Sequence, residues 1–131
     1  MKEDTKKWFD YADENFQAAK VLLDNNLFNP CLQNVQQAVE KMLKAVLAES
    51  KIKLKRTHSI NELVTILADN GLNVSITEDE RDLLDSIYLP SKYPLGSILP
   101  DFEADMQTCR RCIAIAERAR DSVTSLLSQS S

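Results

Sequence analysis

Tyr88, Lys92 and Tyr93 have the side chains that a nucleotide site needs. A lysine ammonium can hold a phosphate as a point charge, and a tyrosine ring can stack on a base. Lys92 and Tyr93 stand in the one clearly irregular stretch, residues 91–97, and loops between rigid elements tend to carry binding residues. We therefore predict a nucleotide or phosphate site here, although both tyrosines could instead cover the core with their rings. Two further cations are candidate contributors, Lys41 and Lys44.

His58 is the only histidine of the 131 residues and is the natural candidate for acid–base chemistry. Arg56 could hold a phosphate beside it, but residues two apart on a helix point to different sides. We expect the two side chains to diverge unless a loop brings them together. The structural alternative places His58 just before a helix, packed near Leu63 or bonded to a neighbouring carbonyl group. The basic run over residues 51–56 could likewise bind phosphate or be a solvated loop.

The three cysteines favour core packing over metal or redox chemistry. Cys109 and Cys112 have redox-motif spacing but fall inside a predicted helix, whereas reactive thiols favour helix N-termini. With Cys31 and His58 they could supply four zinc ligands, yet structural zinc sites usually show two close ligand pairs. We predict buried thiols, with neither a metal nor a cofactor. An odd number of cysteines also fits a reducing compartment.

The elements that must position these residues are helices, because the chain has only two Gly and four Pro. Apolar residues recur every three to four positions over five segments. Ser59 with Glu62, and Thr77 with Glu80, have the spacing of capping boxes. Pro90 is predicted to end the fourth helix. The five predicted helices span residues 5–25, about 30–49, about 60–69, about 78–89 and about 100–127.

The strongest amphipathic pattern covers residues 32–47. Its apolar face comprises Leu32, Val35, Val39, Met42, Leu43 and Val46. The other positions form a shoulder of amides and charges, in which Glu40 precedes Lys44 by the four residues that favour an intrahelical pair. Gln36 and Gln37 could hydrogen-bond to a base edge, lie across a dimer interface or be solvated. Residues 1–131 are predicted to form one domain, an all-α antiparallel up-and-down four-helix bundle with an additional short helix.

The charge and hydropathy of the chain exclude some classes of function. A net charge of -4 and an isoelectric point near 5.0 weigh against non-specific nucleic-acid binding through bulk charge. No apolar run approaches the ~20 residues needed to span a bilayer. Residues 1–4 lack the layout of a signal peptide. We expect a cytoplasmic protein without a membrane partner.

Several motifs occur together in an order that is familiar from one family. The motifs are Trp8 with Ala12 and Ala19, the segment 36–45 (QQAVEKMLKA), Thr57-His58-Ser59-Ile60, and Leu84 and Tyr88 followed by Lys92-Tyr93-Pro94. The third is similar to a Thr-His-Asp/Ser-Leu opening and the last to a Tyr-x-x-x-Arg-Tyr-Pro pattern. Through these residues nearly the whole chain resembles the HEPN family, helical domains found with minimal nucleotidyltransferases in prokaryotes.

The resemblance implies a four-helix core, a homodimer, and a role beside a nucleotidyltransferase, with nucleotide binding or ribonuclease activity. The ribonuclease branch of the family carries an arginine followed after four to six residues by a histidine. Here Lys51, Ile52 and Lys53 stand at that distance from His58, and Lys92 replaces the arginine of the Tyr-Pro pattern. We therefore predict a nucleotide-binding and assembly module that acts with a nucleotidyltransferase partner, without efficient catalysis of its own.

Two alternatives remain open. The first is a metal-independent ribonuclease toxin of a toxin–antitoxin pair, the one case that implies an RNA partner. In it His58 would serve as acid or base, and Arg56 or Lys92 would hold the scissile phosphate. The second is a purely structural bundle with no ligand.

Overall fold

The computed structural model describes residues 1–53, 56–92 and 103–129, with the backbone alone for residues 89–92. These parts of the chain form five α-helices and no strand. The helices are α1 (Glu3–Asp24), α2 (Phe28–Glu49), α3 (Ile60–Asp69), α4 (Glu78–Lys92) and α5 (Met106–Gln129). The prediction of an all-α bundle with three long and two shorter helices is confirmed. None of these described helices is both long and apolar enough to cross a membrane.

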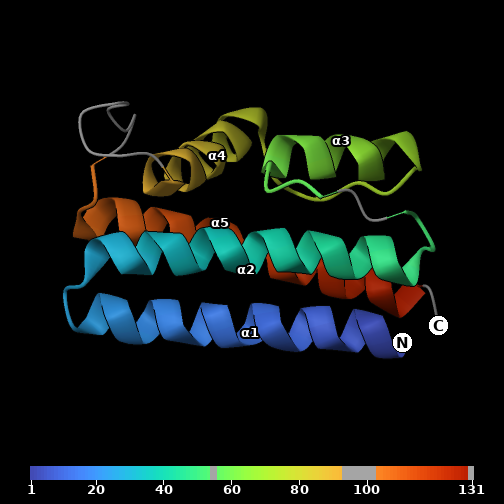
Figure 1. Ribbon diagram of the computed structural model, residues 1–131, viewed down its shortest axis with the longest axis horizontal. Coiled ribbons are helices and arrows are strands. Elements are labelled where there is room, and N and C mark those ends of the chain that lie inside the picture. Colours follow the sequence, from blue (N-terminus) through green and yellow to red (C-terminus); the bar gives the residue numbers. More distant parts are fainter. Residues whose placement is uncertain (54–55, 93–102, 130–131) are drawn as a thin grey trace.

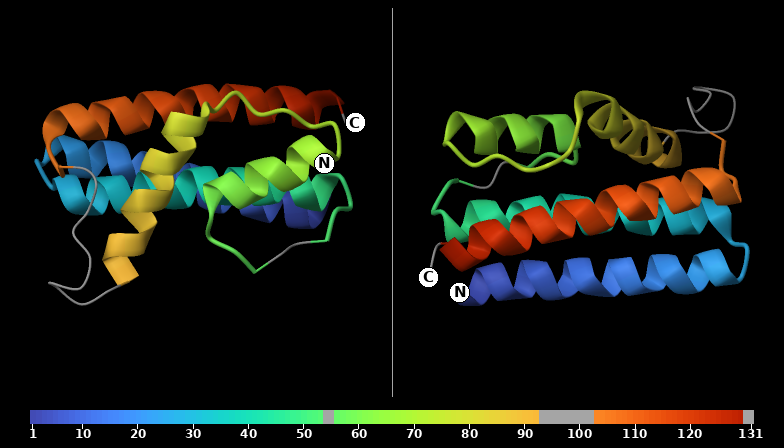
Figure 2. Two further views of the ribbon diagram at one scale, coloured as in Figure 1. Left: turned by 90° about the horizontal axis from the view of Figure 1, so that it is seen from above. Right: turned by 180° about the vertical axis from the view of Figure 1, so that it is seen from behind.

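The helix α2 lies at the centre of the bundle. Figure 1 shows α1 along one side of α2, with α3 and α4 on the opposite side, and the rear view in Figure 2 shows that α5 runs along the back of α2. Helix α1 runs antiparallel to α2 and α5, and α4 crosses the others at a steep angle when seen from above (Figure 2). The additional helix, α3, lies beside the C-terminal half of α2 (Figure 1). As a result α2 contacts all four of the other helices.

This central position explains why α2 is buried on almost every side. The predicted apolar face is confirmed, with no residue more than 1% exposed: Leu32, Val35, Val39, Met42, Leu43 and Val46. A second face is also buried, and it carries Gln36, Glu40 and Lys44. These residues are spaced by four, so they lie above one another along the helix. The amide-and-charge shoulder of the sequence is therefore an interior polar row, covered by the segments around α3 and α4.

Side-chain caps fix where α3 and α4 begin. Ser59 Oγ accepts a hydrogen bond from the Glu62 backbone N–H at 3.2 Å. Thr77 Oγ1 accepts from the Glu80 N–H at 3.3 Å, and Glu80 Oε1 accepts from the Thr77 N–H at 2.9 Å. Each bond satisfies an N–H that has no acceptor within its own helix. Both predicted helix starts are confirmed.

Prolines fall inside two helices where the sequence suggested a boundary. The start of α2, predicted at about residue 30, lies at Phe28, so Pro30 is the third helical residue. A proline in the first turn loses only an N–H that would lack an acceptor anyway. The predicted end of α4 before Pro90 is wrong, because the helix continues to Lys92. A proline so close to the end of a helix removes only one intrahelical hydrogen bond.

The last helix starts later than the sequence predicted. Helix α5 begins at Met106, whereas the predicted start near residue 100 lies outside the described residues. Asp105 Oδ1 accepts a hydrogen bond from the Thr108 N–H at 2.8 Å and so caps the first turn of α5. The apolar period alone could not reveal this boundary, because it runs on without a break before the cap.

Candidate functional site

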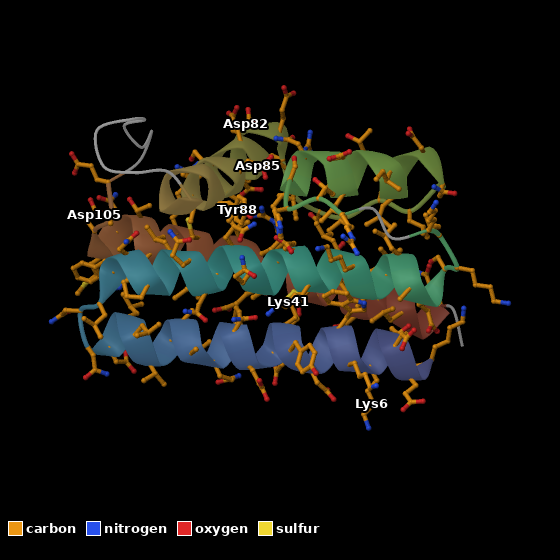
Figure 3. All side chains as sticks on the ribbon, viewed as in Figure 1. Lys6, Lys41, Asp82, Asp85, Tyr88 and Asp105 are labelled. Atoms are coloured by element: carbon orange, nitrogen blue, oxygen red, sulfur yellow. The ribbon has the colours of Figure 1, made fainter. Side chains whose placement is uncertain are left out.

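A pocket of about 350 Å³ opens where the loop before α3 meets α4. The loop contributes Arg56, Thr57, His58 and Ser59, and α4 contributes Asp85 and Tyr88. In Figure 3 Asp85 and Tyr88 lie toward α3 and α2, on the side of the bundle away from α1. A pocket of this volume is of the size that holds one small ligand.

His58 lines this pocket, and its ring is hydrogen-bonded to Glu40 of α2. Its Nδ1 atom lies 3.1 Å from Glu40 Oε1 and 3.2 Å from Glu40 Oε2. The carboxylate is buried, whereas the histidine side chain is 53% exposed. Because a carboxylate only accepts hydrogen bonds, we assign the ring proton to Nδ1, which leaves Nε2 for the pocket. A carboxylate that orients an exposed imidazole in this way prepares it for proton transfer or anion binding.

Three further side chains of α2 fix the Glu40–His58 pair. Lys44 Nζ lies 2.9 Å from Glu40 Oε2, which confirms the predicted intrahelical ion pair. Gln36 Nε2 donates to the His58 backbone carbonyl at 3.2 Å and lies 3.4 Å from Glu40 Oε1. Gln37 Nε2 donates to Gln36 Oε1 at 2.9 Å. Gln36 is therefore neither solvated nor free to read a base, because it ties the loop before α3 to α2.

Tyr88 forms an aromatic wall against His58. The two ring centroids are 4.6 Å apart and the ring planes are inclined by 19°. Burial raises the pKa of the Tyr88 phenol, and the negative charge of Glu40 raises it further. The phenol is thus neutral at ordinary pH, so it adds a ring and a hydroxyl to the pocket without adding negative charge.

Asp85 lines the pocket, but its carboxylate is hydrogen-bonded to the start of α3. Its oxygens accept from the backbone N–H groups of Ile60 at 2.6 Å and Asn61 at 3.2 Å, and from Ser59 Oγ at 3.0 Å. An anion at a helix N-terminus is favoured by the helix dipole. This carboxylate from α4 already supplies that anion, so a bound phosphate would meet the cationic loop at residues 56–58 instead.

Arg56 and His58 come together because they are not on a helix. Residues 56–59 are not helical, which removes the geometric reason to expect divergence. Both side chains line the same pocket. The structural alternative for His58 is right that the residue precedes a helix, but its ring is bonded to the Glu40 carboxylate rather than to a carbonyl.

The other predicted binding residues lie in different places. Lys41 points toward α1, away from Tyr88 (Figure 3), and its Nζ donates to Asn15 Oδ1 at 2.7 Å. Lys44 is engaged by Glu40 and also lies 5.5 Å from the centre of the Trp8 ring. Lys92 is the last residue of α4, and its side chain lies outside the described part of the chain. Tyr93 lies wholly outside the described part of the chain. Of the three residues Tyr88, Lys92 and Tyr93, only Tyr88 can therefore be placed at the pocket.

The sequence did not indicate that Glu40, Gln36 and Asp85 would take part in a site. The spacing of residues 36, 40 and 44 was a usable signal, since it puts three polar side chains on one line of α2. No comparable local signal marks Asp85. Its partners are 24 to 26 residues away in the chain, so only the fold brings them together.

The cysteines belong to the core, as predicted. Cys31, Cys109 and Cys112 are all free and fully buried. Burial raises the pKa of Cys109 and of Cys112 to about 12, so both thiols stay protonated and unreactive at neutral pH. Cys109 Sγ donates to the Phe28 carbonyl at 3.4 Å. Within residues 1–53, 56–92 and 103–129, no three His, Cys, Asp or Glu side chains gather as a metal site would require.

Comparison with protein families assigns the class of this fold. The model of the HEPN domain matches residues 5–126, nearly the whole chain. The chain therefore belongs to the HEPN family. A search of the curated proteins finds no match.

Solved structures share the same arrangement of helices. The protein TT1696 from Thermus thermophilus is 23% identical, with 95% of this chain and 99% of that chain covered and a TM-score of 0.76. ST0689, an archaeal HEPN homologue, is 22% identical over 97% of this chain and 99% of its own, with a TM-score of 0.63. An HEPN domain protein from Thermotoga maritima, tm0613, is 20% identical over 95% and 93% of the two chains, with a TM-score of 0.52. At these identities the likeness establishes the fold alone.

Proposed function

We propose that this HEPN protein is a nucleotide-binding and assembly module that works beside a nucleotidyltransferase partner. The observation that supports this function is the position of Arg56 next to His58, whose ring is held by a buried carboxylate, at a pocket walled by Tyr88. A guanidinium and an imidazole that line one pocket suit a phosphate, to which Nε2 donates once the ring is protonated. An aromatic wall beside them suits a base.

The chemistry of recognition follows from these three side chains. The guanidinium of Arg56 can give two parallel hydrogen bonds to phosphate oxygens. His58 Nε2 can bind a third oxygen, and the Tyr88 ring supplies an apolar surface for the base. The pocket volume of about 350 Å³ suits a single nucleotide better than a long polymer. Lys92 and Tyr93 remain proposed contributors, since they follow Tyr88 by four and five residues in the chain.

The proposed partners are a second copy of the chain and a small nucleotidyltransferase. Both follow from the family, and exposed apolar side chains are in keeping with a protein contact. The exposed group includes Tyr11 at 53%, Val21 at 61% and Leu27 at 49%.

Native co-purification tests this function. The protein is isolated under mild conditions from its own cells, and bound nucleotides and proteins are identified by mass spectrometry. We expect a nucleotide that is lost in Arg56→Ala, together with a nucleotidyltransferase that both proteins retain. Preparations that contain neither would contradict the proposal.

A second candidate function is ribonuclease activity, and one observation favours it. Arg56 and His58 line one pocket, so a scissile phosphate could touch both. Cleavage by the 2′-hydroxyl needs a base, an acid and stabilisation of the phosphorane. His58 could take one proton-transfer role and Arg56 could stabilise charge. Among the described residues that line the pocket, Asp85 is the carboxylate, and it already accepts hydrogen bonds from the start of α3. It is therefore not free to take the other proton-transfer role, and we place binding ahead of catalysis.

A further inference from the structure

Glu40 is a buried carboxylate that reaches the pocket through His58. Only 3% of Glu40 is exposed, and its oxygens lie within hydrogen-bond distance of Lys44, Gln36 and His58. Three of these four residues are on α2, so the position of the carboxylate is set by the helix and does not depend on a ligand. Any change in the charge of the His58 ring therefore acts most directly on its electrostatic interaction with Glu40.

The charges around His58 are closely balanced when the pocket is empty. From α2, the ammonium of Lys44 already balances the carboxylate of Glu40. From α4, Asp85 is engaged by the start of α3, and Tyr88 is neutral. From the loop, Arg56 adds a positive charge beside the ring. In the empty pocket the buried carboxylate of Glu40 is thus shared between Lys44 and the His58 ring.

A bound anion changes this balance. A phosphate monoester adds up to two negative charges beside Arg56 and His58. The ring can then take a proton from water at Nε2, which turns that atom from an acceptor into a donor toward the phosphate. The Nδ1–H bond to Glu40 stays in place, and the imidazolium lies between the bound anion and the buried carboxylate.

We propose that anion binding in this pocket is coupled to the uptake of one proton by His58, and that Glu40 is the positioning residue that holds the ring and stabilises its charged form. The proposal rests on the proposed function, because it concerns the same pocket. It adds that the site responds to pH and prefers a dianion to a neutral ligand of the same shape. Nucleotide release would then accompany a rise in pH, without any change in the helices.

The chain offers a direct readout, because His58 is its only histidine. The ring resonances can be followed by NMR from about pH 5 to about pH 9, the range in which an imidazole changes its charge. The titration is run on the full chain alone, with AMP, and with sulfate, whose charge is constant over this range. We expect both anions to raise the titration midpoint of the ring by about one pH unit. Adenosine, which has the base without the phosphate, should leave the midpoint unchanged.

Variants distinguish a positioning role of Glu40 from a purely structural one. In Glu40→Gln the amide oxygen can still accept from Nδ1–H, but the negative charge is gone. We expect its ring to titrate at lower pH than in the wild type, and the affinity for AMP at pH 7 to fall by about tenfold, with recovery at lower pH. Glu14→Gln, an exposed carboxylate on α1, is the matched control and should titrate as the wild type does. If Glu40→Gln does not fold, the comparison of the wild type with and without anion decides the question by itself.

Each outcome has a distinct meaning. A midpoint that rises with AMP and with sulfate supports the proton coupling. If calorimetry shows that AMP binds while the midpoint does not move, the coupling is wrong and the nucleotide site stands. If AMP and sulfate both fail to bind, the proposed function and the coupling fall together.

Discussion

The Nδ1 atom of His58 lies 3.1 Å from Oε1 of Glu40, so a histidine at the surface is held by a carboxylate from the centre of the bundle. The two residues are 18 positions apart in the chain. They meet because the loop before α3 folds back over the polar row of α2, where Gln36 also binds the carbonyl of His58. This one pair thus connects the core helix to the candidate site.

The central position of α2 predicts a strong dependence of stability on Val39. Val39→Asp places a charge among fully buried apolar side chains, and we expect the free energy of unfolding to fall by about 3 kcal/mol or more. The melting temperature, followed by circular dichroism, measures the loss. Ala114→Asp is the matched control, since Ala114 is exposed on α5 and should tolerate an aspartate. Equal melting temperatures for Val39→Asp and the wild type would contradict the assigned core.

A carboxylate that joins the ends of α1 and α2 gives a prediction about pH. Glu49 accepts from the Lys2 backbone N–H at 3.0 Å and from Thr5 Oγ1 at 2.9 Å. The Lys2 N–H, with the Thr5 hydroxyl next, lowers the pKa of Glu49 below its usual 4.5. Its charge therefore stabilises the folded chain above about pH 4.5, and this stabilisation is lost as the pH falls through the lower folded value.

The substitution Glu49→Gln should accordingly lower the melting temperature at pH 7. The gap from the wild type should close in acid, once the native carboxyl is protonated as well. Thermal melts at both pH values measure the two gaps. A gap that persists unchanged in acid would show that the charge of Glu49 is not what stabilises this corner of the bundle.

Light scattering tests the proposed homodimer. The expected mass at micromolar concentration is twice the 14.8 kDa of the single chain. The expectation derives from the family, and the exposed Tyr11, Val21 and Leu27 are in keeping with it. A mass of one chain across the micromolar range would count decisively against a homodimer.

We expect the isolated protein to have no efficient ribonuclease activity. The pocket holds a single histidine, and its acidic residue, Asp85, is engaged by backbone N–H groups. The assay incubates the purified protein, and His58→Ala beside it, with labelled single-stranded RNA and with transfer RNA. Cleavage by the wild type that disappears in His58→Ala would favour the ribonuclease hypothesis over nucleotide binding.

Features that depend on nearby residues were predictable from the sequence. The apolar face of α2, its Glu40–Lys44 pair and the caps at Ser59 and Thr77 all depend on residues at most four positions apart. The facing of α2 also followed from a period of three to four residues, which needs no knowledge of the partner helices. These local rules were enough to give the helical bundle and most of its boundaries.

The site was harder to predict because its contacts join distant segments. Arg56 and His58 line one pocket only because their loop is not helical, and Asp85 reaches the start of α3 only because α4 packs beside it. No local pattern pairs Glu40 with His58, since a charged residue on an amphipathic helix is ordinarily solvated. For Lys41 the sequence suggested a phosphate contact that the fold does not support, because its ammonium group donates to Asn15 of α1.

Calorimetry with AMP and ATP tests the central proposal, a nucleotide site built on Arg56 and His58, most directly. We expect Arg56→Ala to weaken binding by about tenfold or more, because charged hydrogen bonds to the phosphate are lost. Lys92→Ala should also weaken it, and added salt should weaken it in the wild type. Lys6→Ala, which removes a cation from the far side of α1 (Figure 3), is the control and should bind as the wild type does. Equal affinities in the wild type, Arg56→Ala and Lys6→Ala would contradict the site.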